Sequence, residues 1–437
     1  MLKKHAQKKL ERYVRKYFKK HHPKLVVVVG GIGKTTTKSA ITTVLATKFS
    51  VGASRKTLDE QISVPFGILG IKYPSASSLL DKSITWRMIF KAIRERIKAE
   101  THVDVIIQEI ATERPGEIAH YAKYLHPDVA VVTAVAPECT MNFPNGIDDV
   151  AREELSVAKH SKLTVINYDD VDMRFAPFAE TTNITNYGLK GGEYRFEIIG
   201  GTALDGYVVK FFAPEFPEPI ETTVHLVGEH MLKGALAAGL VAAKFGMTAQ
   251  DIAMALSEVR PVHGCMNPLR GVRETTIIDD TYSSNPYAAI EALRTLYLID
   301  APQRVAILGS MNDLGQYSAQ YHKQVGEQCD PNFLDWVITI GEEAAHYLAP
   351  VAKANGCQVA TFPGPIFAGT FANKILEPGG VILIKGSQEN VFAEESVKLL
   401  LHDVIEQQSL LVRQDEEWMA KKNAWIASLR DIKQDND

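Results

Sequence analysis

The segment from Leu25 to Lys38, LVVVVGGIGKTTTK, constrains the fold of this chain more than any other part of the sequence. Its β-branched run, Val26 to Val29, is typical of a strand buried on both faces of a parallel sheet. The glycines that follow allow a tight turn, and the next residues begin a helix whose first N–H groups would point at one anion. A strand, a glycine turn and a lysine at a helix start together indicate a site for nucleotide phosphates.

The polar residues of this glycine turn suit the chemistry of a phosphate site. Lys34 would place a positive charge beside the β- and γ-phosphates, and the Thr35 hydroxyl would be a ligand for Mg²⁺. The match is to the short pattern GxxGKTT, since valines occupy the place of an earlier glycine. A turn that merely joins a strand to a helix would leave the lysine and the threonines after it unexplained. The residues expected to hold the nucleotide are Gly30, Gly31, Gly33, Lys34, Thr35 and Thr36.

The length and composition of the chain limit its class. With 437 residues, the chain is longer than a domain with a single hydrophobic core of ordinary size, so two or three domains are expected. Its four cysteines form no CxxC pair, which argues against a zinc ribbon or redox motif and fits a reducing cytoplasm. No apolar run approaches the roughly 18 residues that span a bilayer, and the N-terminus lacks the apolar segment of a signal peptide. We therefore expect a cytoplasmic protein.

Residues 1–24 form a strongly basic segment. They contain ten lysines and arginines but one acidic residue, Glu11, although the whole chain has a net charge of −4. Apolar residues recur among them at helical spacing, which predicts a basic amphipathic helix ending near Pro23. Three interpretations stay open: packing on the protein's own domain, peripheral contact with anionic lipid at the inner face of a membrane, or contact with nucleic acid. Nothing further along the chain resembles a nucleic-acid-binding module, so no nucleic acid partner is expected.

The first half of the chain alternates strand-like apolar runs with helical stretches. The runs cover residues 103–110, 128–135 and 163–167. This alternation predicts a parallel sheet with helices on both faces. Residues 186–226 read instead as a small antiparallel excursion, and the helical stretches 228–245 and 248–259 follow it. We expect one central domain over residues 25–262.

A second α/β series begins near residue 264. Four apolar strands, TTIIDD, RVAILG, WVITIG and VILIKG, are separated by helical sequence and predict a second domain over residues 263–410. Residues 411–437, with Trp418 and Trp425 among charges, predict a terminal helix that packs on the body or serves a partner. The predicted fold class is α/β, with a P-loop central domain on a mostly parallel sheet and a C-terminal Rossmann-like α/β domain.

Acidic residues at strand ends are candidates for the rest of the site. Glu109 directly ends an apolar strand, and in an open α/β sheet that end faces the phosphate loop. It is therefore favoured over Glu113, four residues later, as the acid that binds magnesium. Asp279 and Asp280 end another strand, before the turn SSNP. Because acids at strand ends are also common in ordinary loops, the residues alone leave the role of this pair open.

Seven segments in collinear order together resemble one known family. They are GxxGKTTT (30–37), ISVPFGIL (62–69), PGEIAHYAKYLHPDVAVVT (115–133), RPVHGCM (260–266), IIDDTYSSNP (277–286), ILGSMNDLG (307–315) and ILIKGS (382–387). The series is similar to that of the Mur ligases over roughly residues 25–400. Its DDxYxxNP and LGxMxxLG elements most resemble the branch of that family that adds D-alanyl-D-alanine in peptidoglycan synthesis.

This resemblance implies an ATP- and magnesium-dependent amide ligase. Such an enzyme transfers the γ-phosphate of ATP to a substrate carboxylate, and an amino group then attacks the acyl phosphate. Positioning and charge neutralisation are the protein's contribution. The implied partners are ATP and a muropeptide-like precursor that receives D-Ala-D-Ala or a similar short peptide, and a monomer is expected.

The resemblance also assigns the phosphate and metal contacts, with two departures. Lys34 would hold the phosphates, and Thr35 and Glu109 would bind magnesium. Where the family has a metal-binding histidine, this chain has Cys139, whose thiol is a poor ligand for a hard cation. Where the family has a carbamylated lysine, it has Glu154. This carboxylate could replace the carbamate permanently, which makes Glu154 a candidate metal ligand and catalytic residue, or it could be an ordinary acid on a solvated helix.

Further family positions fall in the second domain and on the adenine side. Asp280 would approach the ATP ribose, while Tyr282 and Asn285 would line the cleft. Polar residues of the family are replaced here by Met231, Gly234, Cys265 and Gln388. These losses favour a rival hypothesis, a non-catalytic nucleotide-binding paralogue.

Only about two dozen residues precede the first strand. Mur ligases normally carry an N-terminal domain there that binds the UDP end of the precursor, so we expect that domain to be absent. The basic helix or another chain would then bind the anionic end, or the substrate differs. Folylpolyglutamate synthases and the ligase subunit that amidates lipid II also lack that domain and are alternatives. The DDxYxxNP element argues against the first, and the missing four-cysteine zinc ribbon against the second.

Overall fold

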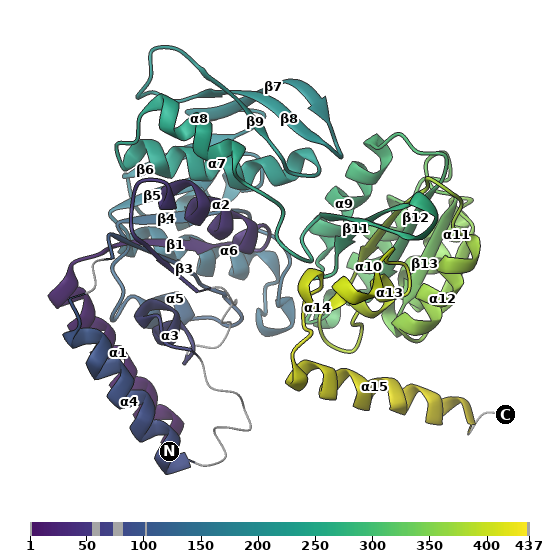
Figure 1. Ribbon diagram of the computed structural model, residues 1–437, viewed down its shortest axis with the longest axis horizontal. Helices are drawn as coiled ribbons and strands as arrows, with labels where there is room; N and C mark the ends of the chain where they lie inside the picture. The colour runs from purple at the N-terminus through teal and green to yellow at the C-terminus, as the bar shows by residue number, and fades with distance from the viewer. Residues whose placement is uncertain (1, 55–61, 73–81, 101–102, 435–437) are drawn as a thin grey trace.

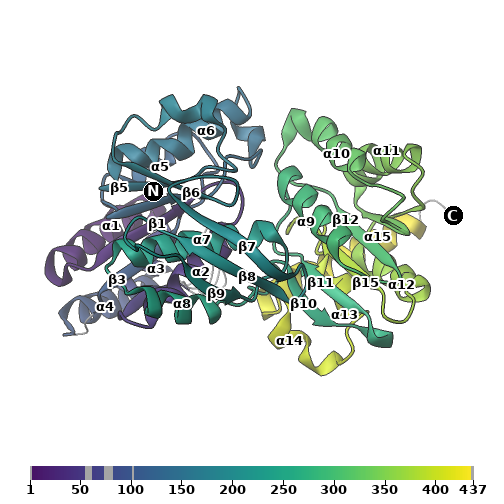
Figure 2. The same cartoon turned by 90° about the horizontal axis from the view of Figure 1, so that it is seen from above.

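The chain folds into two α/β lobes, each built on one β-sheet. The computed structural model describes residues 2–54, 62–72, 82–100 and 103–434. The first sheet has nine strands and the second has six. The two lobes lie side by side and are seen as separate bodies from above (Figures 1 and 2). The α/β fold class with a mostly parallel first sheet is confirmed.

The first sheet places the phosphate-loop strand near its centre. Its order is β2-β3-β1-β4-β5-β6-β7-β8-β9, parallel from β2 to β7 and antiparallel from β7 to β9. The strands are β1 (Lys24–Val29), β2 (Val51–Ala53), β3 (Val105–Glu109), β4 (Val129–Val132), β5 (Leu163–Asn167), β6 (Ile184–Gly188), β7 (Tyr194–Thr202), β8 (Gly206–Phe212) and β9 (Ile220–Val224). The predicted antiparallel segment therefore extends this sheet rather than forming a separate one.

Helices cover both faces of the first sheet, as the valine run of β1 requires. Val26 and Val28 point into one apolar core, while Val27 and Val29 point into another on the opposite face. The first core contains residues of α2, α7 and α8, and the second contains residues of α1, α3, α4, α5 and α6. The bounds are α1 (Leu2–His21), α2 (Lys34–Ala46), α3 (Val64–Leu69), α4 (Lys82–Lys98), α5 (Glu117–Tyr121), α6 (Ile147–Leu155), α7 (Glu229–Lys244) and α8 (Ala249–Ser257).

The basic N-terminal helix packs on its own lobe. Leu10, Val14 and Tyr17 of α1 are buried in the same core as β1, and α1 lies beside α4 (Figure 1). Lys20 at the end of α1 donates a hydrogen bond to the carbonyl of Lys98 at the end of α4. The first of the three interpretations of this segment is confirmed, because its apolar face is occupied within the protein.

The second lobe is a mixed sheet between two layers of helices. Its strand order is β10-β11-β15-β12-β13-β14, parallel except for the β10 edge. Its strands are β10 (Asn267–Arg270), β11 (Thr276–Asp280), β12 (Arg304–Gly309), β13 (Trp336–Ile340), β14 (Val359–Phe362) and β15 (Val381–Lys385). Its helices are α9 (Pro286–Leu298), α10 (Ser318–Glu327), α11 (Ala349–Ala354), α12 (Pro365–Ile375) and α13 (Glu394–Lys398), followed by α14 (Gln407–Leu410) and α15 (Glu416–Gln434).

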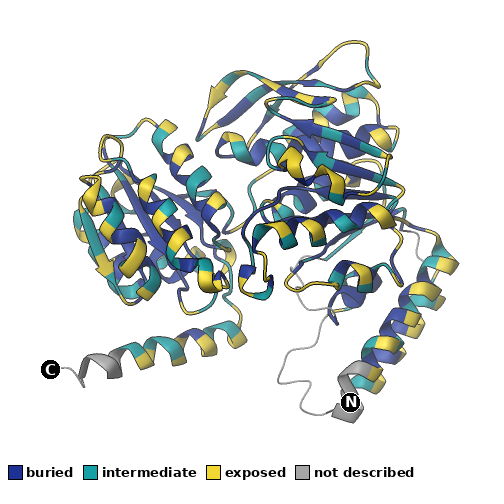
Figure 3. Ribbon diagram, turned by 180° about the vertical axis from the view of Figure 1, so that it is seen from behind, coloured by how far each residue is buried: buried dark blue, intermediate teal, exposed yellow. Residues whose placement is uncertain are grey.

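The terminal helix α15 packs on the second lobe along one side. Trp418 and Trp425 meet the ring of Phe392 edge-on, with ring centroids 6.4 Å and 5.3 Å apart. Exposed and part-buried residues alternate along the helix (Figure 3). Of the two roles predicted for this segment, packing on the body is confirmed. Within the described ranges, no helix combines the length and the apolar character needed to cross a bilayer.

Candidate active site

The phosphate loop has a backbone that requires glycine at three positions. Gly30 and Gly33 adopt φ angles of 126° and 76°, in the range that L-amino acids rarely enter. A Cβ atom on Gly31 would lie 2.7 Å from the Cβ of Ala136, too close for any side chain. Directly after Gly33, α2 begins at Lys34, so the first N–H groups of a helix face the turn. This is the arrangement that binds a phosphate anion.

A cleft of about 210 Å³ lies between the two lobes, over this loop. The first lobe contributes the loop, the segments that follow β3 and β4, and the start of α7. The second lobe contributes the ends of β11 and β15 and the loops after them. The predicted residues that line the cleft are Gly31, Gly33, Lys34, Thr35, Thr36, Glu109, Asp280, Tyr282 and Asn285. Most of the predicted site is thus assembled in one place.

Asn285 connects the second lobe directly to the phosphate loop. Its side-chain N–H donates to the carbonyl of Gly31 at 2.9 Å. Its side-chain oxygen accepts the N–H of Ala288 at 2.9 Å and so caps the start of α9. The capping bond fixes the orientation of the amide, and the contact with Gly31 brings the second sheet against the loop.

Lys34 lies among three carboxylates. Its Nζ atom is 2.6 Å from Oε2 of Glu138, and its side chain is 12% exposed. Burial alone would lower the pKa of this lysine, but Glu138, Glu109 and Glu154 raise it above its ordinary value. The lysine is therefore fully charged at neutral pH and is available to compensate the negative charge of a phosphate.

Glu109 is the last residue of β3 and faces the start of α2. The Thr35 hydroxyl lies 3.1 Å and 3.2 Å from its two carboxylate oxygens, and Lys38 Nζ lies 3.0 Å from Oε2. The parallel register of β1 and β3 sets Glu109 opposite Val28, just before the phosphate loop. The predicted preference for Glu109 over Glu113 agrees with this contact to Thr35, although Glu113 also lines the cleft.

Glu154 of α6 is buried beside the cleft without lining it. Its Oε1 accepts a long hydrogen bond of 3.4 Å from Thr112, which does line the cleft. Its Oε2 makes no hydrogen bond to any residue that the structure describes. Burial raises the pKa of this carboxyl well above its usual value, an effect that Lys34 opposes and Glu138 reinforces. A buried carboxylate oxygen without a partner is what an additional cation would satisfy.

The donor set near the loop fits a magnesium ion bound partly by substrate. Among the described residues, no three His, Cys, Asp or Glu side chains are close enough together to hold an ion by themselves. Mg²⁺ commonly takes only one or two carboxylates from the protein and completes its shell with phosphate oxygens and water. Glu109, Thr35 and the unpartnered oxygen of Glu154 would supply oxygen ligands of this kind.

Cys139 lines the cleft but is unsuited to metal binding. Burial raises the pKa of its thiol, and the nearby carboxylates of Glu138, Asp313 and Glu113 raise it further. The thiol therefore stays protonated, whereas metal ligation by cysteine requires the thiolate. The preceding residue, Glu138, supplies the carboxylate that contacts Lys34. The contact with Lys34 thus comes from Glu138 and not from the residue at the position of the family histidine.

Asp280 is engaged within the second lobe. Its two carboxylate oxygens accept hydrogen bonds from Lys385 Nζ at 2.7 Å and from the N–H of Met266 at 3.2 Å. Its neighbour Asp279 is fully buried, and burial raises the pKa of that carboxyl to about 7 despite hydrogen bonds from Thr281. The predicted residue Asp280 therefore lies in the cleft as part of a buried ion pair.

A second cavity, of about 560 Å³, lies on the other side of the phosphate loop. Met231 and Gly234, two of the departures from the family pattern, line it. Lys233 and Asp170 form an ion pair of 2.7 Å in its wall. Burial lowers the pKa of His230 to about 3, so this wall residue is neutral. The wall of this cavity therefore contains one ion pair, although the polar residues that the family has at Met231 and Gly234 are absent.

Sequence reasoning missed several contacts of the site. Glu138 and Lys38, the partners of Lys34 and Glu109, were not predicted, and neither was the ion pair of Lys233 with Asp170. The only available signal for Glu138 was its position directly before Cys139, the residue that replaces the family histidine. The pairing of Lys385 with Asp280 was not predicted either.

Two family models match the chain. The model described as the Mur ligase middle domain matches residues 28–242, and the one described as the Mur ligase, glutamate ligase domain matches residues 265–388. Together they cover both lobes. A UDP-N-acetylmuramoyl-tripeptide--D-alanyl-D-alanine ligase from Haemophilus influenzae is 25% identical over 332 residues, which are 75% of this chain and 65% of that protein. The enzyme of the same name from Synechocystis is 26% identical over 368 residues, covering 83% of this chain and 71% of that protein.

Solved structures share the fold. A MurF ligase from Thermotoga maritima in complex with ADP superposes with a TM-score of 0.74 at 22% identity, covering 90% of this chain and 83% of that one. A folylpolyglutamate synthase from the same organism gives a TM-score of 0.60 at 14% identity, covering 92% of this chain and 95% of that one. The chain spans less than two thirds of the length of the Haemophilus relative.

Proposed function

This chain belongs to the Mur ligase family, and we propose that it is an ATP-dependent amide ligase that adds D-Ala-D-Ala or a similar short peptide to a muropeptide precursor. The observation that carries this proposal is the cleft between the lobes, where a glycine phosphate loop, a charged lysine and carboxylates meet the second lobe. The named function of the full-length relatives supports the choice of substrate.

The phosphate loop and Lys34 bind the β- and γ-phosphates of ATP. Lys34 pairs with Glu138 in the structure, and bound phosphates would replace that carboxylate as its partner. Thr35, Glu109 and Glu154 would hold magnesium, which would lower the charge on the transferring phosphoryl group. The adenosine extends from the loop along the cleft between the lobes, where Asp280, Tyr282 and Asn285 line the wall.

The reaction proceeds in two transfers. A carboxylate oxygen of the precursor attacks the γ-phosphorus, so that an acyl phosphate forms and ADP leaves. The amino group of the dipeptide then attacks the acyl carbon, the tetrahedral intermediate expels phosphate, and the amine loses a proton as the amide forms. Lys34 stabilises negative charge during the first transfer, and the two lobes hold the reactants together.

We expect ATP hydrolysis to depend on both peptide substrates. Phosphate release is measured with UDP-muramoyl tripeptide and D-Ala-D-Ala, each omitted in turn, and the product is identified by its mass. Release above background requires both compounds if the assignment is correct. The control pairs are glutamate with a folate acceptor, and an amine donor with lipid II. Turnover with only one of these control pairs would show that its acceptor, and not the muropeptide precursor, is the substrate.

The protein is proposed to act in the cytoplasm, with a weak peripheral contact at the inner face of the membrane. The helices α1 and α4 lie side by side, and both carry exposed cations. These are Lys8, Arg12, Arg15, Lys16, Lys19 and Lys20 on α1, and Arg87, Lys91, Arg94 and Lys98 on α4. Since the apolar face of α1 is buried within the lobe, the contact with anionic lipid would be electrostatic, at about 1 kcal/mol per cation near the surface.

Neutralising the exposed face of α1 should remove this contact. The variant Arg12→Gln/Arg15→Gln/Lys19→Gln changes residues opposite the buried face, so the fold is retained. We expect the wild type to co-sediment with vesicles containing phosphatidylserine at low salt and to dissociate near physiological salt, and the variant not to bind. The control variant Lys323→Gln/Lys353→Gln/Lys374→Gln carries the same charge change on the second lobe and should bind normally. Equal binding by both variants would contradict a contact through α1.

A further inference from the structure

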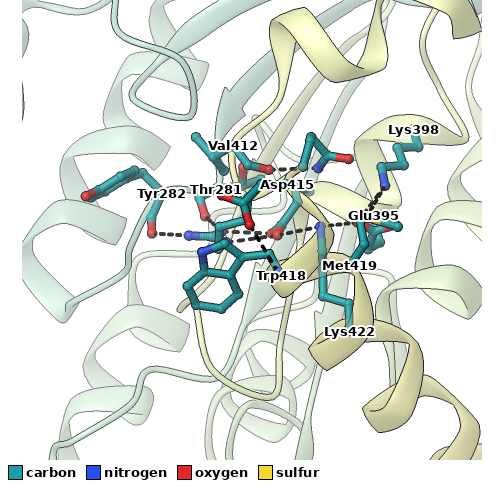
Figure 4. A network of polar contacts seen from close by, with 12 residues as sticks. Thr281, Tyr282, Glu395, Lys398, Val412, Asp415, Trp418, Met419 and Lys422 are labelled. Atoms are coloured by element: carbon teal, nitrogen blue, oxygen red, sulfur yellow. Dashed lines mark hydrogen bonds and ion pairs between the residues drawn. The ribbon is translucent and has the colours of Figure 1, made fainter. Parts of the chain in front are cut away.

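Residues 411–434 contact a loop of the cleft. Neither their own sequence nor the family match assigns these residues to the site. We call residues 411–434 the C-terminal strap; they lie beyond the second matched family segment, which ends at residue 388. The strap leaves α14, passes the cleft loop that follows β11, and continues as α15 over α13 (Figure 4). Its contacts connect two parts of the second lobe that line the cleft.

Arg413 makes the central contact of the strap. Its guanidinium donates to the carbonyl of Tyr282 at 2.8 Å and to the carbonyl of Thr281. On its other edge it forms a forked pair with both carboxylate oxygens of Glu394, each at 2.8 Å. The arginine side chain is 6% exposed and the glutamate is fully buried. One planar fork therefore holds two successive backbone carbonyls and a buried carboxylate at the same time.

The remaining contacts of the strap attach it to the second lobe. Lys422, with no exposed surface, lies 2.5 Å from Glu395 and 3.3 Å from Glu394. Val412 packs closely on Gly264, so that a Cβ on this glycine would lie 2.9 Å from the Val412 side chain. Arg413 itself adopts a φ angle of 56°, a conformation that is unfavourable for any residue other than glycine. The backbone strain is therefore balanced by the contacts of this one side chain.

The carbonyls that Arg413 holds belong to the loop that reaches the phosphate site. Tyr282 and the three residues after it line the cleft, and Asn285 at the end of the loop donates to Gly31. The N–H of Tyr282 is bonded to the carbonyl of Gly264, so the loop is held on both sides of its backbone. The strap is thus connected to the phosphate-binding turn by the hydrogen bonds of Arg413, the backbone from Thr281 to Asn285 and the hydrogen bond from Asn285 to Gly31.

We propose that Arg413 is a positioning residue for nucleotide binding, because it fixes the backbone of Thr281 and Tyr282 and through it the place of Asn285 against the phosphate loop. This inference rests on the proposed binding of nucleotide in the cleft. Arg413 does not line the cleft, and its guanidinium reaches the site only through backbone carbonyls of the loop, so it acts through the loop and not on the substrate. The strap then contributes to nucleotide binding as well as to stability.

The test compares two buried cations of the same strap. Arg413→Lys keeps the positive charge beside Glu394 but removes the fork that reaches both carbonyls. Lys422→Met removes a buried cation that contacts Glu394 and Glu395 and does not touch the loop. We expect both variants to melt at lower temperature than the wild type. Only Arg413→Lys should weaken ADP binding, by about tenfold at a temperature well below both melting points.

A second readout separates this inference from the proposed function. Amide hydrogen exchange of residues 281–285 in the nucleotide-free protein should be faster in Arg413→Lys than in the wild type and unchanged in Lys422→Met. Equal ADP affinity and equal exchange in Arg413→Lys and wild type would overturn the positioning role. If the wild type binds no nucleotide, the proposed function fails, and the exchange measurement alone still decides whether Arg413 positions the loop.

Discussion

Replacing Lys34 with methionine is expected to lower ATP-dependent turnover by about 10²- to 10³-fold, the loss typical of removing one charged contact to a developing anion. Lys34 is a largely buried cation near Glu138, Glu109 and Glu154, so its removal also leaves negative charge where the phosphates must enter. The lost contact and the uncompensated negative charge both disfavour bound ATP. Steady-state phosphate release and equilibrium binding of ADP measure the two separately.

The control for this prediction is Lys48→Met. Lys48 follows α2 and is half exposed, and its Nζ atom lies 3.1 Å from Asp251. Neither residue lines the cleft. We expect it to retain wild-type turnover. A Lys34→Met enzyme that turns over at the wild-type rate would exclude the proposed phosphate contact. Tight ATP binding by the wild type without turnover, lost in Lys34→Met, would instead support the non-catalytic paralogue.

Glu154→Gln should depress turnover by about 10²-fold without lowering the melting temperature. The glutamine keeps the size of the side chain but cannot supply a carboxylate to magnesium. Because Oε2 of Glu154 is buried without a partner among the described residues, removing its charge costs the nucleotide-free fold little. Activity and stability therefore separate in this variant, which a purely structural role would not produce. The magnesium concentration needed for half-maximal rate should also rise.

The matched control is Asp148→Asn on the same helix. Asp148 lies 3.7 Å from Arg174 and is more than half exposed, so its loss should leave the rate unchanged. Glu154→Lys adds a sharper comparison, since it restores the residue that the family carbamylates. Partial recovery of its activity by added bicarbonate would support a carboxylate role at this position. The predicted alternative, an acid on a solvated helix, is wrong because Glu154 is buried. An unaltered rate in Glu154→Gln would exclude a catalytic role for this carboxyl.

The local parts of the site could be predicted from the sequence, whereas the contacts between distant segments could not. The phosphate loop follows from adjacent residues, because the valine run, the positive-φ glycines and Lys34 lie within one strand–turn–helix unit. Glu109 follows from its place at a strand end. By contrast, Glu138 is 104 residues from Lys34, and Asn285 is 254 residues from Gly31. The periodicity of apolar residues does not show which side chains far apart in the sequence come into contact.

The same distinction applies to the fold. The change from parallel to antiparallel pattern after residue 186 was visible in the alternation of apolar residues. That β7, β8 and β9 continue the first sheet depends on pairing between β6 and β7, which begins at Tyr187 and Tyr194 and leaves no periodic signal. The role of the terminal helix was open for a similar reason, since the partners of Arg413 and Lys422 lie on other elements.

The central claim is that a carboxylate of the precursor is activated by phosphoryl transfer in this cleft. It is tested most directly by labelling that carboxylate with ¹⁸O and measuring the label in the phosphate released during amide formation with D-Ala-D-Ala. The account predicts one ¹⁸O atom in each phosphate, because the carboxylate oxygen that attacks the γ-phosphorus leaves with it. Phosphate released without ¹⁸O while the amide forms would contradict the acyl-phosphate route and with it the role assigned to the cleft.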